Sequence, residues 1–146
     1  MATLQDYRDE RLRKLDELKQ LGVNPYPAKA QRTKSLADIT SKFDELDGQT
    51  ATVVGRITGI RKFGKLAFIV IRDASGSLQL FLHAPDVAEI DAVAGVIGMK
   101  QLNLLDTGDF VQATGEVIRT KTGEISVAVK QLKLLTKSLR PMPEEL

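Results

Sequence analysis

The sequence predicts a mainly β protein: a small five-stranded barrel that follows a helical extension at the N-terminus. Three observations predict this fold. Several short segments alternate apolar and polar residues, as strands with one buried face do. Turn-forming clusters, such as Asp73-Ala74-Ser75-Gly76 and Lys121-Thr122-Gly123, separate these segments. An apolar, alanine-rich stretch at 85–105 interrupts the strands after the third. Its apolar residues recur near helical spacing, which predicts a helix, continuous or broken, although Gly95 and Gly98 count against it.

Five strands with a helix between the third and the fourth is the order of an OB-fold. An antiparallel β-sandwich is the competing architecture, but it would need more strands and would leave the inserted helix unexplained. We therefore divide the chain into a helical extension at 1–48, an OB-fold barrel at 49–136, and the start of a linker at 137–146.

The first predicted helix covers residues 4–21. Thr3 and Asp6 have the spacing of a capping box, and Gly22 is a C-terminal stop. Its apolar stripe consists of Leu4, Tyr7, Leu12, Leu15, Leu18 and Leu21. The opposite face carries mixed charge, so we expect a surface helix laid on the barrel. The alternative is that Arg8, Lys14 and Lys19 also touch a nucleic-acid backbone.

The link from this helix to the first strand has two parts. Residues 22–27 contain two prolines and predict a rigid, non-helical segment. Ser35 with Asp38 then predicts a second cap, and Leu36, Ile39 and Phe43 a short helix with one apolar side. A turn at residues 47–48 leads into the first strand.

The strands are assigned from their alternation. Residues 50–61 form the first strand, residues 61–82 form a hairpin of the second and third, and the fourth and fifth flank the turn at 121–123. Gly55 and Gly59 suit the bends that a small barrel needs. The inward residues of the hairpin are Ala67, Ile69, Ile71, Leu78, Leu80 and Leu82.

The outward face of the hairpin is unusual for a solvated sheet. It carries Phe68, Val70, Arg72, Ser77, Gln79 and Phe81. Two aromatic rings, an amide and a guanidinium on one face are typical of a platform on which unpaired bases stack. The alternative is that the N-terminal helix covers Phe68 and Phe81, which would make them satellite core.

OB-folds bind at strands two and three and at the loops that join strands one to two and four to five. The first loop would supply Arg61, Lys62 and Lys65, and the second Arg119, Lys121 and Glu124. The cations are candidate phosphate contacts, whereas Gln79 and Glu124 are candidate readers of base edges. Each charge taken alone also fits an ordinary surface loop, but chance would scatter these residues over both faces of the sheet rather than gather them on one.

Composition excludes several classes of function. The chain has 146 residues, a formal net charge of +2, no cysteine and one histidine, so thiolate metal sites and disulfides are excluded. His83 alone cannot build a metal site, and no catalytic set is visible. No run reaches transmembrane length and no signal peptide is apparent, so we expect a soluble cytoplasmic protein without a membrane partner.

The residues resemble the N-terminal part of bacterial class II lysyl-tRNA synthetases over nearly the whole chain. The barrel motifs, shared with aspartyl- and asparaginyl-tRNA synthetases, are Val54-Gly55-Arg56-Ile57, Gly64-Lys65-Leu66-Ala67-Phe68, Arg72-Asp73 with Gly76, Gln79 and Phe81, Gly108-Asp109-Phe110-Val111, and Lys121-Thr122-Gly123-Glu124-Ile125-Ser126. Two flanking motifs point to lysine: Asn24-Pro25-Tyr26-Pro27 and Leu134-Leu135-Thr136-Lys137-Ser138-Leu139-Arg140-Pro141.

The resemblance implies an anticodon-binding barrel. Phe68 matches the aromatic residue that stacks on the central anticodon uridine, and Gln79 matches the amide that reads it. Glu124 matches an acidic anticodon reader, Phe81 a second stacking ring, and Arg61 a basic anticodon contact. The family has a large catalytic domain after the barrel, which uses ATP and Mg²⁺ to charge the tRNA with lysine, and it forms homodimers. This chain alone is therefore expected to bind tRNA without cofactors and without aminoacylating it.

Two other classes of function stay open at this point. The leucine stripe of the first helix and the apolar stretch 85–105 would also suit a protein-interaction module. The barrel face would also suit general binding of single-stranded nucleic acid.

Overall fold

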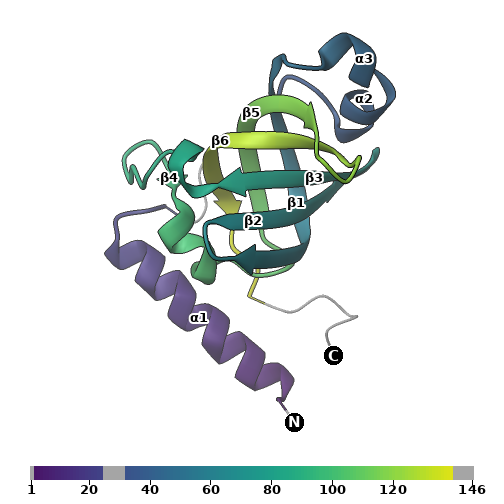
Figure 1. Ribbon diagram of the computed structural model, residues 1–146. Helices are drawn as coiled ribbons and strands as arrows, with labels where there is room; N and C mark the ends of the chain where they lie inside the picture. The colour runs from purple at the N-terminus through teal and green to yellow at the C-terminus, as the bar shows by residue number, and fades with distance from the viewer. Residues whose placement is uncertain (1, 25–31, 140–146) are drawn as a thin grey trace.

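In the computed structural model, which describes residues 2–24 and 32–139, a β-barrel is flanked by a long helix on one side and two short helices at one end (Figure 1). The helices are α1 (Leu4–Gln20), α2 (Leu36–Ser41) and α3 (Phe43–Leu46). The strands are β1 (Thr50–Phe63), β2 (Leu66–Asp73), β3 (Gly76–His83), β4 (Val96–Ile97), β5 (Phe110–Arg119) and β6 (Ile125–Thr136). Two 3-10 helices, η1 (Ala84–Asp86) and η2 (Met99–Leu104), flank β4.

The predicted barrel is confirmed. Its strands follow the order β3-β2-β1-β5-β6 in antiparallel pairs, and a parallel pairing of β3 with β6 closes the ring. Irregularities in pairing allow the strands to coil: β1 shifts register between Ile57 and Gly59, and β5 shifts between Phe110 and Val111 and again between Thr114 and Gly115. At Gly115 the strands approach so closely that a Cβ atom would lie 2.0 Å from the carbonyl oxygen of Ala128.

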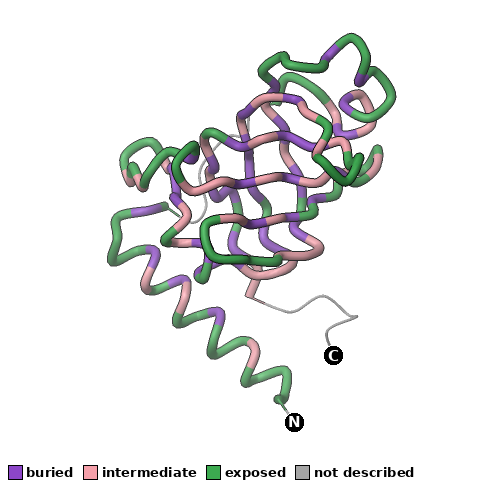
Figure 2. The backbone as a smooth tube through the Cα atoms, in the orientation of Figure 1, coloured by how far each residue is buried: buried purple, intermediate pink, exposed green. Residues whose placement is uncertain are grey.

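Buried residues alternate with less buried ones along the barrel strands (Figure 2), and their side chains form one core cluster with residues of the helices. All six hairpin residues predicted to face inward are at most 2% exposed. Val53 and Ile57 of β1, Val111 of β5 and Val127 of β6 join them. Because strand side chains alternate between faces, burial of this set fixes the complementary set, including Phe68 and Phe81, on the outside of the barrel.

A continuous helix over residues 85–105 is wrong, and the two helical pieces between the third and fourth barrel strands are short 3-10 helices. The segment instead consists of η1, a tight loop, β4 and η2, and β4 adds to the outer edge of β6. Reciprocal backbone hydrogen bonds between Asp91 and Val96 close the loop, and Gly95 takes a φ of 76°. Val87 and Ile97 are both buried in the core, but the chain between them leaves it, and Val93 is fully exposed. Their near-helical spacing therefore does not correspond to one face of a helix.

Helix α1 begins with the predicted capping box: Thr3 Oγ1 accepts from the Asp6 backbone N–H, and the Thr3 N–H donates to the Asp6 carboxylate. Its predicted apolar stripe is only half right. Leu15 and Leu18 are buried, but Leu4, Leu12 and Leu21 stay 36–44% exposed. The helix touches the rest of the protein mainly through η2, so much of its length projects away from the barrel (Figure 1).

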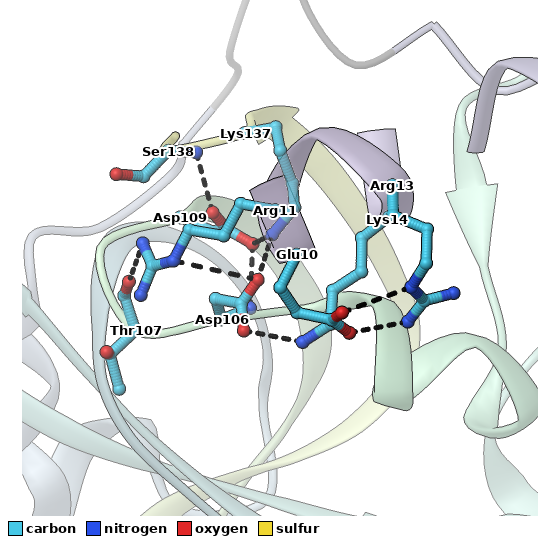
Figure 3. A network of polar contacts seen from close by, with 9 residues as sticks. All are labelled: Glu10, Arg11, Arg13, Lys14, Asp106, Thr107, Asp109, Lys137 and Ser138. Atoms are coloured by element: carbon cyan, nitrogen blue, oxygen red, sulfur yellow. Dashed lines mark hydrogen bonds and ion pairs between the residues drawn. The ribbon is translucent and has the colours of Figure 1, made fainter. Parts of the chain in front are cut away.

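Helix α1 is tied to the barrel by a buried network of charges (Figure 3). Lys137, whose side chain is fully buried, donates to Asp106 at 2.6 Å and to Asp109 at 2.7 Å. Lys14 of α1 donates to the other oxygen of Asp106 at 2.6 Å, and Arg11 donates to the carbonyl of Thr107 at 3.0 Å. The network therefore joins α1, the loop before β5 and the segment after β6. It also contradicts the assignment of Lys14 to a nucleic-acid backbone, because its ammonium group is engaged and its side chain is 14% exposed.

The two aspartates of this network titrate in opposite directions. Burial by itself would raise the pKa of Asp106, but hydrogen bonds from Lys137 and Lys14 outweigh it, and the pKa lies below its ordinary value. Burial dominates at Asp109 and raises its pKa, against the opposing charge of Lys137 and backbone N–H donors from Asp106 and Ser138.

The turn between β2 and β3 positions the two short helices. Asp73 accepts from the backbone N–H groups of Ser75 and Gly76, which fixes the turn, and from that of Leu36 at the start of α2. Burial alone would raise the pKa of Asp73, but the hydrogen bonds from Ser75, Leu36 and Gly76 lower it. The predicted cap is present, with Ser35 Oγ accepting from the Asp38 N–H.

Parts of two predicted segments lie outside the described residues: the link at 22–27 beyond residue 24, and the linker at 137–146 beyond residue 139. Among the residues that are described, no helix combines the length and the apolar character needed to cross a membrane.

Candidate nucleic-acid interface

The centre of the candidate site is a pair of phenyl rings on the outside of the barrel. Phe68 of β2 and Phe81 of β3 are direct cross-strand partners, with ring centres 5.5 Å apart and ring planes tilted by 46°. Both rings are half-buried rather than sealed. Helix α1 packs mainly against η2 and contributes no residue to the lining of the pocket at these rings, so the alternative that it covers them as satellite core is wrong.

The turn between β5 and β6 rises beside these rings and makes one wall of a pocket. The pocket has a volume of about 420 Å³. It is lined by Leu66, Phe68, Phe81, Ile118, Arg119, Thr120, Lys121 and Thr122. The β2–β3 hairpin and the β5–β6 hairpin, which are far apart in the sequence, thus line one pocket. Its floor is apolar and its rim carries Arg119 and Lys121, as the sequence predicts for the strand face and the second loop.

Phe63 extends the aromatic surface and was missed by the sequence reasoning. Its ring centre lies 6.2 Å from that of Phe68 in an edge-to-face arrangement, and the residue is 55% exposed. The sequence did hold a signal: Phe63 precedes Gly64 and Lys65, which form the turn between β1 and β2, and an aromatic residue beside a tight turn has little core to pack against. Gly64 takes a φ of 58° in this turn.

The basic residues at this end of β1 do not all face the rings. Arg61 and Lys62 lie within β1, not in a loop as predicted, and only Lys65 is in the turn. Arg61 is the cross-strand partner of Phe68, so it shares the outer face, and its guanidinium lies 5.7 Å from the ring centre of Phe63. Lys62 pairs with the inward-facing Ala67 and therefore points to the opposite side.

The basic residues of the second hairpin differ in how they are held. Arg119 stacks over the ring of Phe43 in α3, 4.8 Å from its centre, and donates to the Gly123 carbonyl at 3.1 Å. Its position is thus fixed by protein contacts, although the residue remains exposed. Lys121 is exposed at the tip of the turn and, in the described part of the chain, its side chain has no recorded partner.

Gln79 and Glu124 are linked through Ser126. The parallel pairing of β3 with β6 puts Gln79 beside Ser126, and the Gln79 side-chain amide donates to Ser126 Oγ at 3.0 Å. Ser126 Oγ in turn donates to the Glu124 carbonyl at 3.3 Å. Among the described residues nothing bonds to the Gln79 side-chain oxygen, which can therefore accept a hydrogen bond. Glu124 is exposed just before β6, two residues from Ser126.

His83 lies outside this group, at the end of β3, where its Nδ1 is 2.9 Å from the Asp86 carboxylate. Across residues 2–24 and 32–139, no cluster of acidic or histidine side chains has the arrangement of a metal site.

The geometry suits unpaired nucleotides. The half-exposed rings of Phe68 and Phe81 offer flat apolar surfaces, and the neighbouring cations can neutralise phosphates. The Gln79 side-chain oxygen and the exposed Glu124 carboxylate can each accept hydrogen bonds from base edges. A closed barrel of this strand order, with such a face on β2 and β3, defines a nucleic-acid-binding OB domain.

Comparison with known proteins agrees with that class. Residues 51–135 match the family model described as OB-fold nucleic acid binding domain, and the chain belongs to this family. Its similar curated proteins include the lysine–tRNA ligase of Moorella thermoacetica, which is 43% identical over 135 residues, covering 92% of this chain and 26% of that protein.

Two further relatives carry the same name. The lysine–tRNA ligase of Clostridium novyi is 39% identical over 137 residues, and that of Nostoc sp. is 42% identical over 151 residues. These alignments cover 93% and 97% of this chain and 26% of each relative. The chain thus spans about a quarter of the length of the curated relatives that it matches.

Proposed function

We propose that this chain is the anticodon-binding domain of a lysine–tRNA ligase and recognises a lysine anticodon with a central uridine. The observation that carries the proposal is the half-exposed pair of Phe68 and Phe81, which floors a pocket with a basic rim. The similarity to lysine–tRNA ligases supplies the identity of the RNA.

In this proposal the anticodon loop opens its bases over β2 and β3. Phe68 stacks on the central base, Phe81 supports that ring and offers a second surface, and each stacked base contributes about 1–3 kcal/mol. Gln79 accepts from the central uridine through its free oxygen, while Ser126 holds the amide nitrogen and so fixes which end faces the base. Glu124 accepts from a neighbouring base.

The cations divide between phosphate contacts and support. Lys121 and Lys65, both exposed at turns, hold phosphates, and Arg61 contacts the anticodon beside Phe63. Arg119 acts from a position fixed by Phe43. The Lys62 side chain points away from the rings. It would therefore contact the RNA only where the RNA backbone extends beyond the outer face of β2 and β3.

The test is a titration of a lysine anticodon stem-loop with the wild type and with Phe68→Ala. We expect the variant to bind at least tenfold more weakly, since about 1.4 kcal/mol corresponds to tenfold in the dissociation constant. The matched control is Thr52→Ala, on the outer side of β1, where the hydroxyl contacts Thr114 at 2.9 Å. Equal affinities for the two variants would contradict the proposal.

The reading of the central base is tested separately with Gln79→Ala. We expect this variant to lose part of its preference for uridine, about 1–3 kcal/mol for a well-placed pair, when stem-loops with other central bases are compared. An unchanged preference would remove Gln79 from the base contacts.

We further propose that the whole protein activates lysine with ATP and Mg²⁺ in a catalytic domain outside this chain, works as a homodimer, and acts in the cytoplasm.

A competing function is a protein-interaction module, favoured by the exposed Leu4 and Leu12 on α1. Salt distinguishes them: RNA binding weakens steeply as salt rises, whereas an apolar contact persists. The other alternative is general binding of single-stranded nucleic acid. It is tested by comparing the affinity for an unstructured oligonucleotide with the affinity for the stem-loop, and equal affinities would favour it.

A further inference from the structure

A second cationic cluster lies on the outer face of β1 and β2, at the opposite end from Phe68. Arg56 of β1 and Arg72 of β2 are direct cross-strand partners, and both are exposed. Phe110 of β5 is the partner of Arg56 on the other side, and the Arg56 guanidinium lies 5.9 Å from its ring centre. We call these three residues the arginine row.

Among the described residues, the two guanidinium groups of the arginine row lack a counter-charge. Like charges directly opposite each other on neighbouring strands destabilise a sheet. Neither guanidinium has a carboxylate partner within the described ranges 2–24 and 32–139. Of the described residues that line the adjoining hollows, one is acidic. This residue, Asp73, already accepts hydrogen bonds from Ser75, Gly76 and Leu36 and lies 3.6 Å from Arg32. An anion placed between Arg56 and Arg72 would relieve the repulsion.

The surface beside the row has room for such an anion. Two adjoining hollows of about 390 and 540 Å³ share Arg72, Asp73 and Phe110 in their lining. The second also takes in Arg56 and the hydroxyl of Ser77, the cross-strand partner of Arg72. Planar guanidinium groups with a hydroxyl nearby are the donors that phosphate groups favour.

The row continues the face on which the bases are proposed to stack. Phe68 and Arg72 are four residues apart on β2, so they point to the same side at a separation of about 13 Å, given about 3.3 Å per residue. Val70, 36% exposed, lies between them. Single strands cover about 4–16 nucleotides on an OB-fold, so a strand held at Phe68 extends far enough to reach the row.

We propose that Arg56 and Arg72 together bind one backbone phosphate of the RNA whose anticodon stacks on Phe68, with Phe110 holding Arg56 in place. This inference rests on the proposed function but assigns a separate site, which contributes affinity and register and reads no base. The ligand is a sugar–phosphate backbone, not an acidic protein surface, because the row adjoins the nucleic-acid face and offers hydroxyl and guanidinium donors together.

The first test uses the double variant R56Q/R72Q, which removes both charges and keeps polar side chains of similar reach. With the lysine anticodon stem-loop we expect about tenfold weaker binding. Loss of one phosphate contact should also make the slope of log K against log salt shallower by about 0.7. The preference for central uridine should not change. The matched control is Lys100→Gln on η2, an exposed cation that the geometry places outside the site.

The second test locates the phosphate. Stem-loops carrying a single uncharged methylphosphonate at each successive loop position are titrated against the wild type and R56Q/R72Q. We expect the methylphosphonate at one loop position to weaken binding to the wild type. The same substitution should not weaken binding to R56Q/R72Q any further. If every substitution weakens both proteins equally, the site does not contact phosphate and the inference is wrong.

The outcomes separate the inference from the function on which it rests. If Phe68→Ala weakens binding but R56Q/R72Q changes neither affinity nor salt slope, the function stands and the phosphate site is wrong. If Phe68→Ala has no effect, the proposed function fails first. A double variant that keeps its RNA affinity but changes its mass in solution would assign the row to a protein contact, which also overturns the inference.

Discussion

Replacing Lys137 by methionine tests whether the buried charge network holds the ends of the domain together. The Lys137 ammonium is fully buried and bonds two carboxylates, at 2.6 Å to Asp106 and 2.7 Å to Asp109. Methionine fills similar volume but leaves Asp109, which is 0% exposed, without its cation. Removing one partner of a buried ion pair costs about 3–5 kcal/mol, and we expect that loss in the free energy of unfolding.

The control has the same bond length and a different environment. Arg13 on α1 lies 2.6 Å from Glu10, but the two side chains are 56% and 53% exposed. Water screens that pair, so Arg13→Met should leave stability within the error of the measurement. The comparison therefore varies burial and holds the ion-pair distance fixed.

The assay is urea unfolding followed by far-ultraviolet circular dichroism, since the chain has no tryptophan to report fluorescence. A shift in the midpoint at constant slope measures the change in stability. If Lys137→Met costs less than about 1 kcal/mol, or no more than Arg13→Met does, the network does not contribute as its burial implies. A changed slope would show instead that unfolding is no longer the same two-state transition, as expected if α1 detached before the barrel unfolds.

Three further predictions concern the barrel, its pH dependence and its binding face. Gly115→Ala should prevent normal pairing of β5 with β6 and lower the melting temperature, because its Cβ would lie 2.0 Å from a backbone oxygen. Gly59→Ala is the control, because no atom lies within 4 Å of its Cβ, and it should leave the melting temperature nearly unchanged. Equal effects of the two substitutions would contradict the geometry. The lowered pKa of Asp106 contributes stability that is present above a pH of about 4 and is lost as the pH falls through the folded-state pKa, so Asp106→Asn should flatten the acid side of an unfolding profile. Phe63→Ala should weaken stem-loop binding without lowering the melting temperature, because the ring is 55% exposed and its neighbours include Arg61.

The strands could be predicted because each one has a single buried face. Ala67, Ile69 and Ile71 alternate with outward residues, and a register slip of one residue would expose all three. The alternation of buried and outward residues involves only a few consecutive positions, so it can be recognised in the sequence of a single strand. It also placed Phe68 on the outside of the barrel before any tertiary contact was known.

The segment 85–105 was mispredicted because a spacing of three or four residues does not by itself require a helix. Its backbone turns back at Gly95 and passes so close to residue 89 that a Cβ on Gly98 would lie 3.2 Å from the Glu89 Cα atom. Gly95 and Gly98 already counted against a helix in the sequence, and in the folded chain both occupy positions that disfavour a side chain, which outweighs the apolar spacing.

The error on α1 has a different origin. Arg11 is 4% exposed while Leu12 beside it is 36% exposed, the reverse of what hydrophobicity predicts. Arg11 is buried because its partners, such as the Thr107 carbonyl, lie 96 residues away in the chain. The partners of a buried charge are set by tertiary packing, and no periodicity along one helix can reveal them.

The candidate site depends on both kinds of constraint. Alternation along β3 puts Gln79 and Phe81 on the outer face, but only the parallel pairing with β6 brings Ser126 to the Gln79 amide and Ala128 next to Phe81. The pairing that closes the barrel therefore also orients the proposed base reader. A substitution that weakens this closure should impair RNA discrimination before it unfolds the protein, because the amide loses its hydrogen-bond partner while the aliphatic core beneath it remains packed.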